Sequence, residues 1–105
     1  MLILFDQGTP VGIRDALSGH EVKTAAEQGW SSLLNGQLLS AAEQTGFDVL
    51  LTTDTNIHLQ QNMAGRRIAV VAISPNRWML IRRKLPEIAA AIEAAKPGQI
   101  SLVEF

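Results

Sequence analysis

Residues 49–54, VLLTTD, decide the fold of this chain, because a short run of apolar and β-branched residues leads directly into a polar turn that contains Asp54. Residues 2–6, LILFD, have the same form and end on Asp6. Unbroken apolar runs of this length are typical of strands that are buried on both faces of a parallel sheet. If the two strands are neighbours, both aspartates lie at the carboxyl edge of one sheet, where open α/β proteins bind ligands.

Helix and strand patterns alternate through the first half of the chain. Thr9 and Pro10 predict the start of a short helix that closes at Gly19. A half-polar strand follows at residues 20–24. A second helix is expected from residue 35 to its stop at residue 46, where glycine ends it.

The second half continues the alternation. Residues 68–73 predict a third buried strand, and residues 100–105 predict a last one. Between them, apolar residues recur at spacings of three and four over residues 76–95, which predicts an amphipathic helix with a kink or break at Pro86. Trp78 keeps the apolar period of this helix, so we expect it in the core.

Strands that alternate with helices predict a three-layer α/β/α sandwich with a mostly parallel sheet of about five strands. The half-polar second strand prefers an edge, so we predict the strand order 2-1-3-4-5. This order makes the strands that lead to Asp6 and Asp54 neighbours at a switch point. The chain has 105 residues and shows no repeat or linker, which indicates a single domain over residues 1–105.

Composition narrows the classes of function. The formal net charge of -1 argues against a protein-wide attraction to nucleic acid or to an anionic membrane. The sequence contains no cysteine, which excludes disulfides and thiolate metal sites. No apolar stretch approaches the roughly 20 residues that a membrane-spanning helix needs. We therefore expect a cytoplasmic protein of bacterial type with no membrane partner.

Asp6 and Asp54 are the first candidates for chemistry. Two carboxylates meet the minimum for one Mg²⁺ or Mn²⁺ ion, with water completing the octahedron. The other interpretation is that each aspartate forms a turn or caps a helix, since both precede possible helices. The spacing alone favours capping over metal binding.

Several motifs, taken together, share the pattern of one family. They are LFDQGTP at residues 4–10, GHEV at residues 19–22 followed by Glu27 and Gly29, a helix that begins at Asn35, and TTDTN at residues 52–56. From residue 1 to about residue 73 the chain resembles the short PIN-like proteins of bacterial toxin–antitoxin loci, which are similar to the PIN ribonuclease superfamily. The resemblance implies an acidic cluster that holds magnesium or manganese for phosphodiester hydrolysis. It also implies single-stranded RNA as substrate, an antitoxin protein as partner, and a homodimer.

The resemblance assigns roles residue by residue. Asp6 and Asp54 match the metal-binding and catalytic aspartates, and Glu27 matches a catalytic glutamate. The chain departs from the family at three commonly acidic positions that hold neutral amides here, namely Gln7, Asn35 and Asn56. An amide oxygen can ligate a metal, but it supplies no charge and cannot act as a base. Two alternatives remain open: a one-metal ribonuclease in which Glu27 or a metal-bound hydroxide activates water, or an inactive module that binds RNA or protein.

Polar and aromatic side chains around the predicted crevice suit a nucleobase edge or a ribose hydroxyl. The candidates for substrate binding are Gln7, Trp30, Asn35, Thr53, Asn56, Gln60 and Gln61. Trp30 lies in a predicted loop, where it could stack on a base, and packing is the alternative. For the amides the alternative is a surface position in a loop, with Asn35 capping its helix.

Basic residues gather in two clusters in the second half of the chain. The first is Arg66 with Arg67, and the second comprises Arg77, Arg82, Arg83 and Lys84. One surface could therefore contact phosphates despite the near-neutral total charge. A solvated helix face is the commoner explanation of such a pattern.

Overall fold

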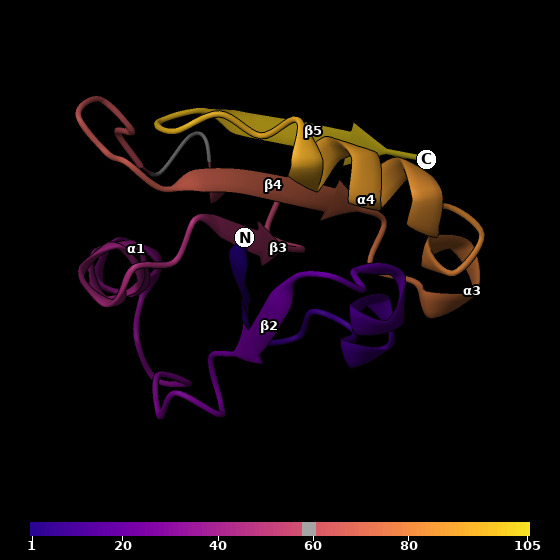
Figure 1. Cartoon of the computed structure of the whole chain (residues 1–105), viewed down its shortest axis with the longest axis horizontal. Helices are drawn as coiled ribbons and strands as arrows, with labels where there is room; N and C mark the ends of the chain where they lie inside the picture. The colour runs from indigo at the N-terminus through magenta and orange to yellow at the C-terminus, as the bar shows by residue number, and fades with distance from the viewer. Residues whose placement is uncertain (58–60) are drawn as a thin grey trace.

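The computed structural model describes residues 1–57 and 61–105 (Figure 1). The strands in these residues are β1 (Leu2–Phe5), β2 (Glu21–Thr24), β3 (Val49–Thr52), β4 (Ala69–Ser74) and β5 (Ile100–Glu104). They form one sheet in the order β2-β1-β3-β4-β5, and every neighbouring pair is parallel. The predicted parallel sheet and its strand order are confirmed.

Burial explains which strands take the centre of the sheet. All four residues of β3 are buried, and Ile3, Leu4 and Phe5 of β1 are fully buried. β2 buries none of its residues completely and exposes Glu21, so it is stable at an edge where only one side needs a partner strand. β1 and β3 therefore lie side by side at the centre, which brings their carboxyl ends together.

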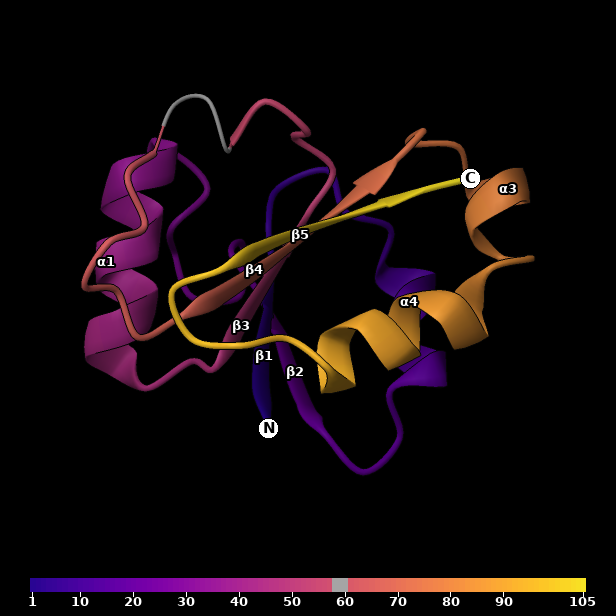
Figure 2. The ribbon, with the colours of Figure 1, turned by 90° about the horizontal axis from the view of Figure 1, so that it is seen from above.

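Helices cover both faces of the sheet and complete the three layers (Figure 2). The helix α1 (Asn35–Thr45) packs on one face. The 3₁₀ helix η1 (Val11–Ala16) and the helices α3 (Trp78–Ile81) and α4 (Leu85–Glu93) pack on the other. Successive residues of a strand point to opposite faces, so β1 contributes Leu4 to the α1 side and Phe5 to the α4 side. Each fully buried side chain of this size contributes about 1.5–3 kcal/mol.

The helix predicted for residues 76–95 is broken into α3 and α4, as the proline indicated. A turn at residues 82–84 separates the two helices. Pro86 lies in the first turn of α4, where a missing backbone N–H removes no helical hydrogen bond. No helix among the residues that the structure describes is long and apolar enough to cross a membrane.

The expectation that Trp78 belongs to the core is wrong. Trp78 is 41% exposed, and it is the first residue of the short helix α3, in which Ile81 is the buried residue. Its ring lies against Gly12 in η1 so closely that a Cβ atom on Gly12 would approach Trp78 Cη2 to 2.5 Å. The indole therefore covers backbone of η1 and keeps part of its surface open to solvent.

Candidate functional site

Asp6 lies one residue beyond β1 at the carboxyl edge of the sheet. Its backbone N–H donates to the carbonyl of Leu51 at 2.9 Å, which continues the pairing of β1 with β3 by one residue. Its carboxylate Oδ1 accepts a hydrogen bond from the N–H of Gln7 at 2.7 Å, and Oδ2 accepts one from the Thr52 hydroxyl at 2.8 Å. Two neighbouring strands thus fix the direction of this carboxylate.

The same threonine holds Asp54. The N–H of Asp54 donates to Thr52 Oγ1 at 3.1 Å, so one nearly buried hydroxyl is bonded to groups of both aspartates. Oδ1 of Asp54 accepts from the N–H of Asn56 at 3.0 Å, and Oδ2 accepts from the side-chain amide of Asn35 at 2.9 Å. The two aspartates that lie 48 positions apart in sequence are therefore joined through Thr52.

No positive side chain neutralises these two acids within the described residues, because the ion pairs there involve other carboxylates. Each carboxylate oxygen of Asp6 and Asp54 accepts a hydrogen bond from a group in the described residues, and a carboxylate oxygen can accept more than one. The edge therefore carries two oriented negative groups that can still accept a cation.

Glu27 is placed differently from the two aspartates. Its Oε1 accepts hydrogen bonds from the N–H of Thr24 at 2.8 Å and from Nη2 of Arg14 at 2.9 Å, while its own N–H donates to Thr24 Oγ1. These bonds cap the turn that follows β2. The Thr24 hydrogen bond, with Arg14 adding to it, lowers the pKa of the Glu27 carboxyl.

Glu27 therefore does not share the hydrogen bonds that link Asp6 and Asp54 through Thr52. Within residues 1–57 and 61–105, no three side chains of histidine, cysteine, aspartate or glutamate gather closely enough to hold a metal ion. Asp6 and Asp54 with water fit one Mg²⁺ or Mn²⁺ ion, since magnesium is commonly bound through one or two carboxylates. They do not supply the charge that a two-metal site requires.

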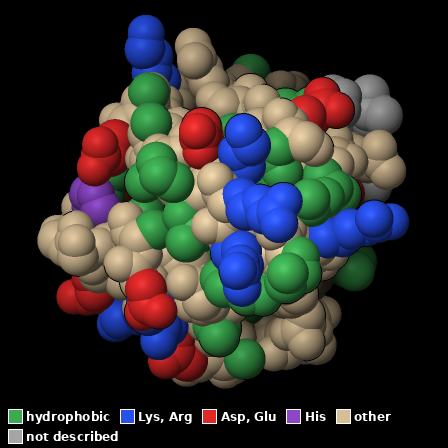
Figure 3. Space-filling view, turned by 90° about the vertical axis from the view of Figure 1, so that its right-hand side faces the viewer, with side chains coloured by type: hydrophobic (Ala, Val, Ile, Leu, Met, Phe, Trp, Pro, Cys, Tyr) green, Lys and Arg blue, Asp and Glu red, His purple; other side chains and the backbone are tan. Residues whose placement is uncertain are grey.

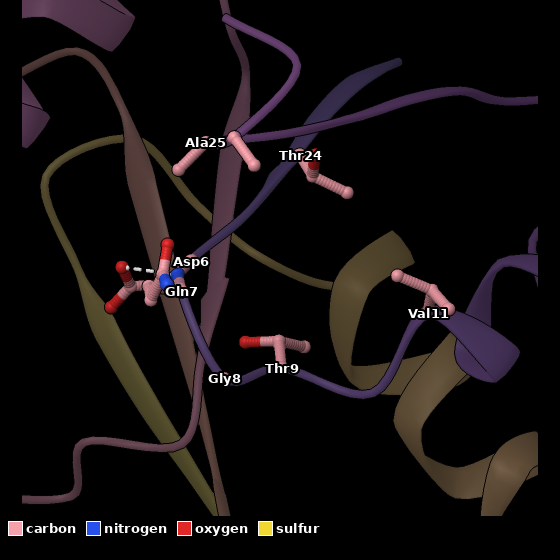
Figure 4. A pocket seen from close by; sticks show the side chains of 8 residues that line it. Asp6, Gln7, Gly8, Thr9, Val11, Thr24 and Ala25 are labelled. Carbon is pink, nitrogen blue, oxygen red and sulfur yellow. Dashed lines mark hydrogen bonds between the residues drawn. The ribbon is translucent and has the colours of Figure 1, made fainter. Parts of the chain in front are cut away.

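A hollow of about 190 Å³ opens beside Asp6 (Figure 4). It is formed by the segments that leave β1 and β2 at the carboxyl edge, and its lining residues are Asp6, Gln7, Gly8, Thr9, Val11, Thr24, Ala25 and Ala26. Pockets that enclose a whole small molecule usually measure about 300–1,000 Å³. This one suits a smaller group, such as the phosphate or sugar of a longer ligand.

The structure brings several predicted binding residues to this edge. Asn35 contacts Asp54 directly, and Gln7 and Asn56 supply the N–H groups that bond the two carboxylates. The side-chain amide of Gln61 lies beside Gly36 at the start of α1.

The other predicted binding residues are placed less directly. Thr53 is half-buried between Thr52 and Asp54, and Gln60 lies outside the described residues. Trp30 packs edge-on against Phe47 with ring centroids 6.0 Å apart, on the side of the core that α1 covers. Phe47 precedes β3 and so lies towards the amino end of the sheet, away from Asp6 and Asp54. This contact agrees with the alternative that Trp30 packs in the protein and does not stack on a base.

Sequence reasoning missed Thr52 as a residue of the site. The signal was a hydroxyl-bearing residue at the last position of a buried strand, two residues before an aspartate. A buried hydroxyl needs a partner, and only groups at the strand ends are near enough to provide one.

Comparison with protein-family models, with curated proteins and with solved structures finds no match to this chain. The five-stranded parallel α/β fold in the order 2-1-3-4-5 is consistent with a PIN-like domain.

Proposed function

We propose that this chain is a PIN-like, metal-dependent ribonuclease that holds one Mg²⁺ or Mn²⁺ ion between Asp6 and Asp54. The observation that carries the proposal is the junction at Thr52, whose hydroxyl bonds the carboxylate of Asp6 and the backbone N–H of Asp54, with no cation paired to either acid among the described residues. A pair of acids held at a rigid sheet edge favours a cation over a turn-forming role alone.

The residues of this chain have distinct tasks in such a site. Thr52 fixes the carboxylate of Asp6, and Asn35 with Asn56 fixes that of Asp54, so the ligands are oriented before an ion arrives. A bound divalent ion supplies Lewis acidity and lowers the pKa of a bound water. Gln7 is exposed beside Asp6, where its amide can donate to a phosphate oxygen or a base edge.

Glu27 would act as a base only in a rearranged site. Its lowered pKa makes it a weak proton acceptor, and its Oε1 is engaged by Arg14 and Thr24. A catalytic role for Glu27 therefore requires that Arg14 turns away when substrate binds. The arrangement favours water activation at the Asp6–Asp54 pair.

A second candidate, an inactive PIN-like module that binds RNA or protein, is favoured by one specific observation. Both oxygens of Asp54 accept hydrogen bonds from Asn35 and Asn56, so the carboxylate already serves to tie the β3 loop to the start of α1. A purely structural aspartate would make these same bonds. The experiment must therefore separate metal binding from cleavage.

Manganese titration by calorimetry and cleavage of a single-stranded RNA pool test both candidates. The variants Asp6→Asn and Asp54→Asn remove one charge each, and Asp15→Asn is the matched control, because Asp15 is exposed and forms no recorded bond at the site. We expect one manganese ion to bind wild type and Asp15→Asn, and EDTA to abolish cleavage.

The outcomes separate the candidates. Loss of both binding and cleavage in the two site variants supports the ribonuclease. Manganese binding without cleavage by wild type supports the inactive module. A wild type that neither binds manganese nor cleaves RNA refutes the ribonuclease, and cleavage that survives in both site variants comes from another nuclease.

The proposal extends to the role that the family resemblance implies. As a toxin, the cytoplasmic chain would form a homodimer and be neutralised by an antitoxin protein. Induced expression of wild type should then arrest bacterial growth, whereas Asp6→Asn should not.

A further inference from the structure

A cationic and aromatic surface surrounds the short helix α3, and we name it the α3 surface. Its exposed residues are Arg77, Trp78, Met79, Arg82, Arg83 and Lys84. Trp78 is 41% exposed and Met79 is 58% exposed. Figure 3 views the molecule from the side of α3 and shows basic side chains gathered there among hydrophobic ones.

The α3 surface is rich in positive charge, and the next acid along the chain is Glu87 in the first turn of α4. Residues 75–86 contain four basic residues and no acidic one. Within the described part of the chain, the recorded ion pairs use other cations than these four. A solvated helix face often alternates both signs of charge, whereas the α3 surface combines four cations with a partly exposed indole.

The α3 surface also adjoins the candidate site. The side-chain amide of Asn76, just before α3, donates to the carbonyl of Gly8 at 3.4 Å, and Gly8 lines the hollow beside Asp6. Trp78 lies on Gly12 of η1, and Val11 of η1 lines the same hollow and is 62% exposed. A ligand that crosses the α3 surface can therefore continue into the hollow.

We propose that the α3 surface binds single-stranded RNA and leads the strand to the Asp6–Asp54 edge. The four basic side chains contact phosphates, which gives affinity without sequence specificity. Trp78 provides a flat apolar surface on which one base stacks, and only an unpaired base can offer its face to it. The choice of RNA rests on the proposed function, but this binding needs no metal ion.

Anisotropy titration of a fluorescein-labelled ten-nucleotide oligouridine in EDTA tests the surface without catalysis. The double variant Arg82→Ala/Arg83→Ala is compared with Arg67→Ala/Lys96→Ala, which removes the same charge elsewhere. Arg67 lines a hollow with Met1 and Asp48 at the opposite, amino end of the sheet. Each lost phosphate contact lowers the slope of log affinity against log salt by about 0.7, so we expect a decrease of about 1.4 for the α3 variant.

At about 0.1 M salt two lost contacts correspond to roughly 25-fold weaker binding, and the control variant should bind nearly as wild type does. Equal losses in the two double variants would show general charge attraction and overturn the proposal. Binding of an RNA duplex as tightly as of the single strand would overturn it too.

Substitution of Trp78 tests the stacking. Trp78→Ala should weaken binding by roughly 5- to 150-fold, the cost of one lost base–aromatic stack, whereas Trp78→Phe should keep most of the affinity. In Trp78→Phe, the emission of the remaining Trp30 should not change when RNA is added. Urea unfolding of each variant shows that it is folded, and unchanged affinity of folded Trp78→Ala would exclude stacking.

Failure of this inference and failure of the proposed function remain distinguishable. Asp6→Asn should bind the oligonucleotide in EDTA at least as tightly as wild type does, because a negative charge beside the strand is removed, while it loses cleavage. RNA binding by the α3 surface without any cleavage by wild type would refute only the ribonuclease. Cleavage with unaltered binding in the α3 variant would refute only the α3 surface.

Discussion

Replacing Thr52 with valine keeps the shape of a side chain that is 1% exposed and removes only its hydroxyl. In wild type this hydroxyl donates to Oδ2 of Asp6 at 2.8 Å and accepts from the N–H of Asp54 at 3.1 Å. The variant leaves both groups without that partner. We expect it to be less stable and to bind manganese more weakly, because each aspartate then loses one of the hydrogen bonds that hold it in place.

The magnitude follows from the two bonds. A hydrogen bond to a charged group contributes about 1.5–3 kcal/mol and one between neutral groups about 0.5–1.5 kcal/mol. Asp6 is half-buried, so water replaces part of its lost bond and the lower values apply. The added methyl group recovers a little through burial, and the net decrease in unfolding free energy is about 2 kcal/mol.

Urea unfolding monitored by circular dichroism measures this decrease, which corresponds to a midpoint lower by roughly 1 M. Thr9→Val is the matched control, because the hydroxyl of the buried Thr9 makes one neutral bond, to the carbonyl of Leu51 at 3.2 Å. It should cost about 1 kcal/mol. Thr52→Ser restores the hydroxyl and should recover manganese affinity. If Thr52→Val is no less stable than Thr9→Val, the shared hydroxyl does not organise the site.

Two further perturbations probe the acids around the pair. Asn35→Asp replaces the amide that donates to Asp54 Oδ2 with a second carboxylate. Thermal melts at neutral pH should therefore show an unfolding free energy lower by about 1–3 kcal/mol, and added manganese should reverse this loss. An equal loss with manganese present would contradict metal binding there. The lowered pKa of Glu27 stabilises the fold at neutral pH, and this contribution is lost as the pH falls through that pKa. NMR titration of Arg14→Ala should find the pKa of Glu27 still lowered, since the Thr24 hydrogen bond is the larger cause, and an ordinary value would contradict this ranking.

The central part of the fold could be predicted from the sequence because it depends on the pattern of apolar and polar residues along the chain. The apolar runs that lead to Asp6 and Asp54 specify buried neighbouring strands, and the half-polar run at residues 20–24 specifies an edge strand. Once the order of the strands is known, the meeting of the two aspartates follows from chain direction alone. The parallel sheet and its strand order could therefore be predicted from the sequence.

The remaining details depend on contacts that periodicity does not encode. Trp78 shares the helical period of the core residues, but its helix ends after four residues, and its ring packs on Gly12 instead of the sheet. The resemblance matches Glu27 to a catalytic glutamate, but in the structure Arg14 from η1 donates a hydrogen bond to its carboxylate. Contacts of this kind between separate segments depend on the direction in which each side chain points. A single sequence does not give these directions.

The apolar character of the interior has a practical consequence. In the part of the chain that the structure describes, the buried polar side chains are Thr9 and Thr52, neither of which changes charge, and no buried side-chain nitrogen or oxygen lacks a partner. A chelator therefore acts at the rim of the molecule and leaves its interior unchanged. Any activity that disappears under such treatment and returns on dialysis can be attributed to the rim alone, without invoking a folding defect.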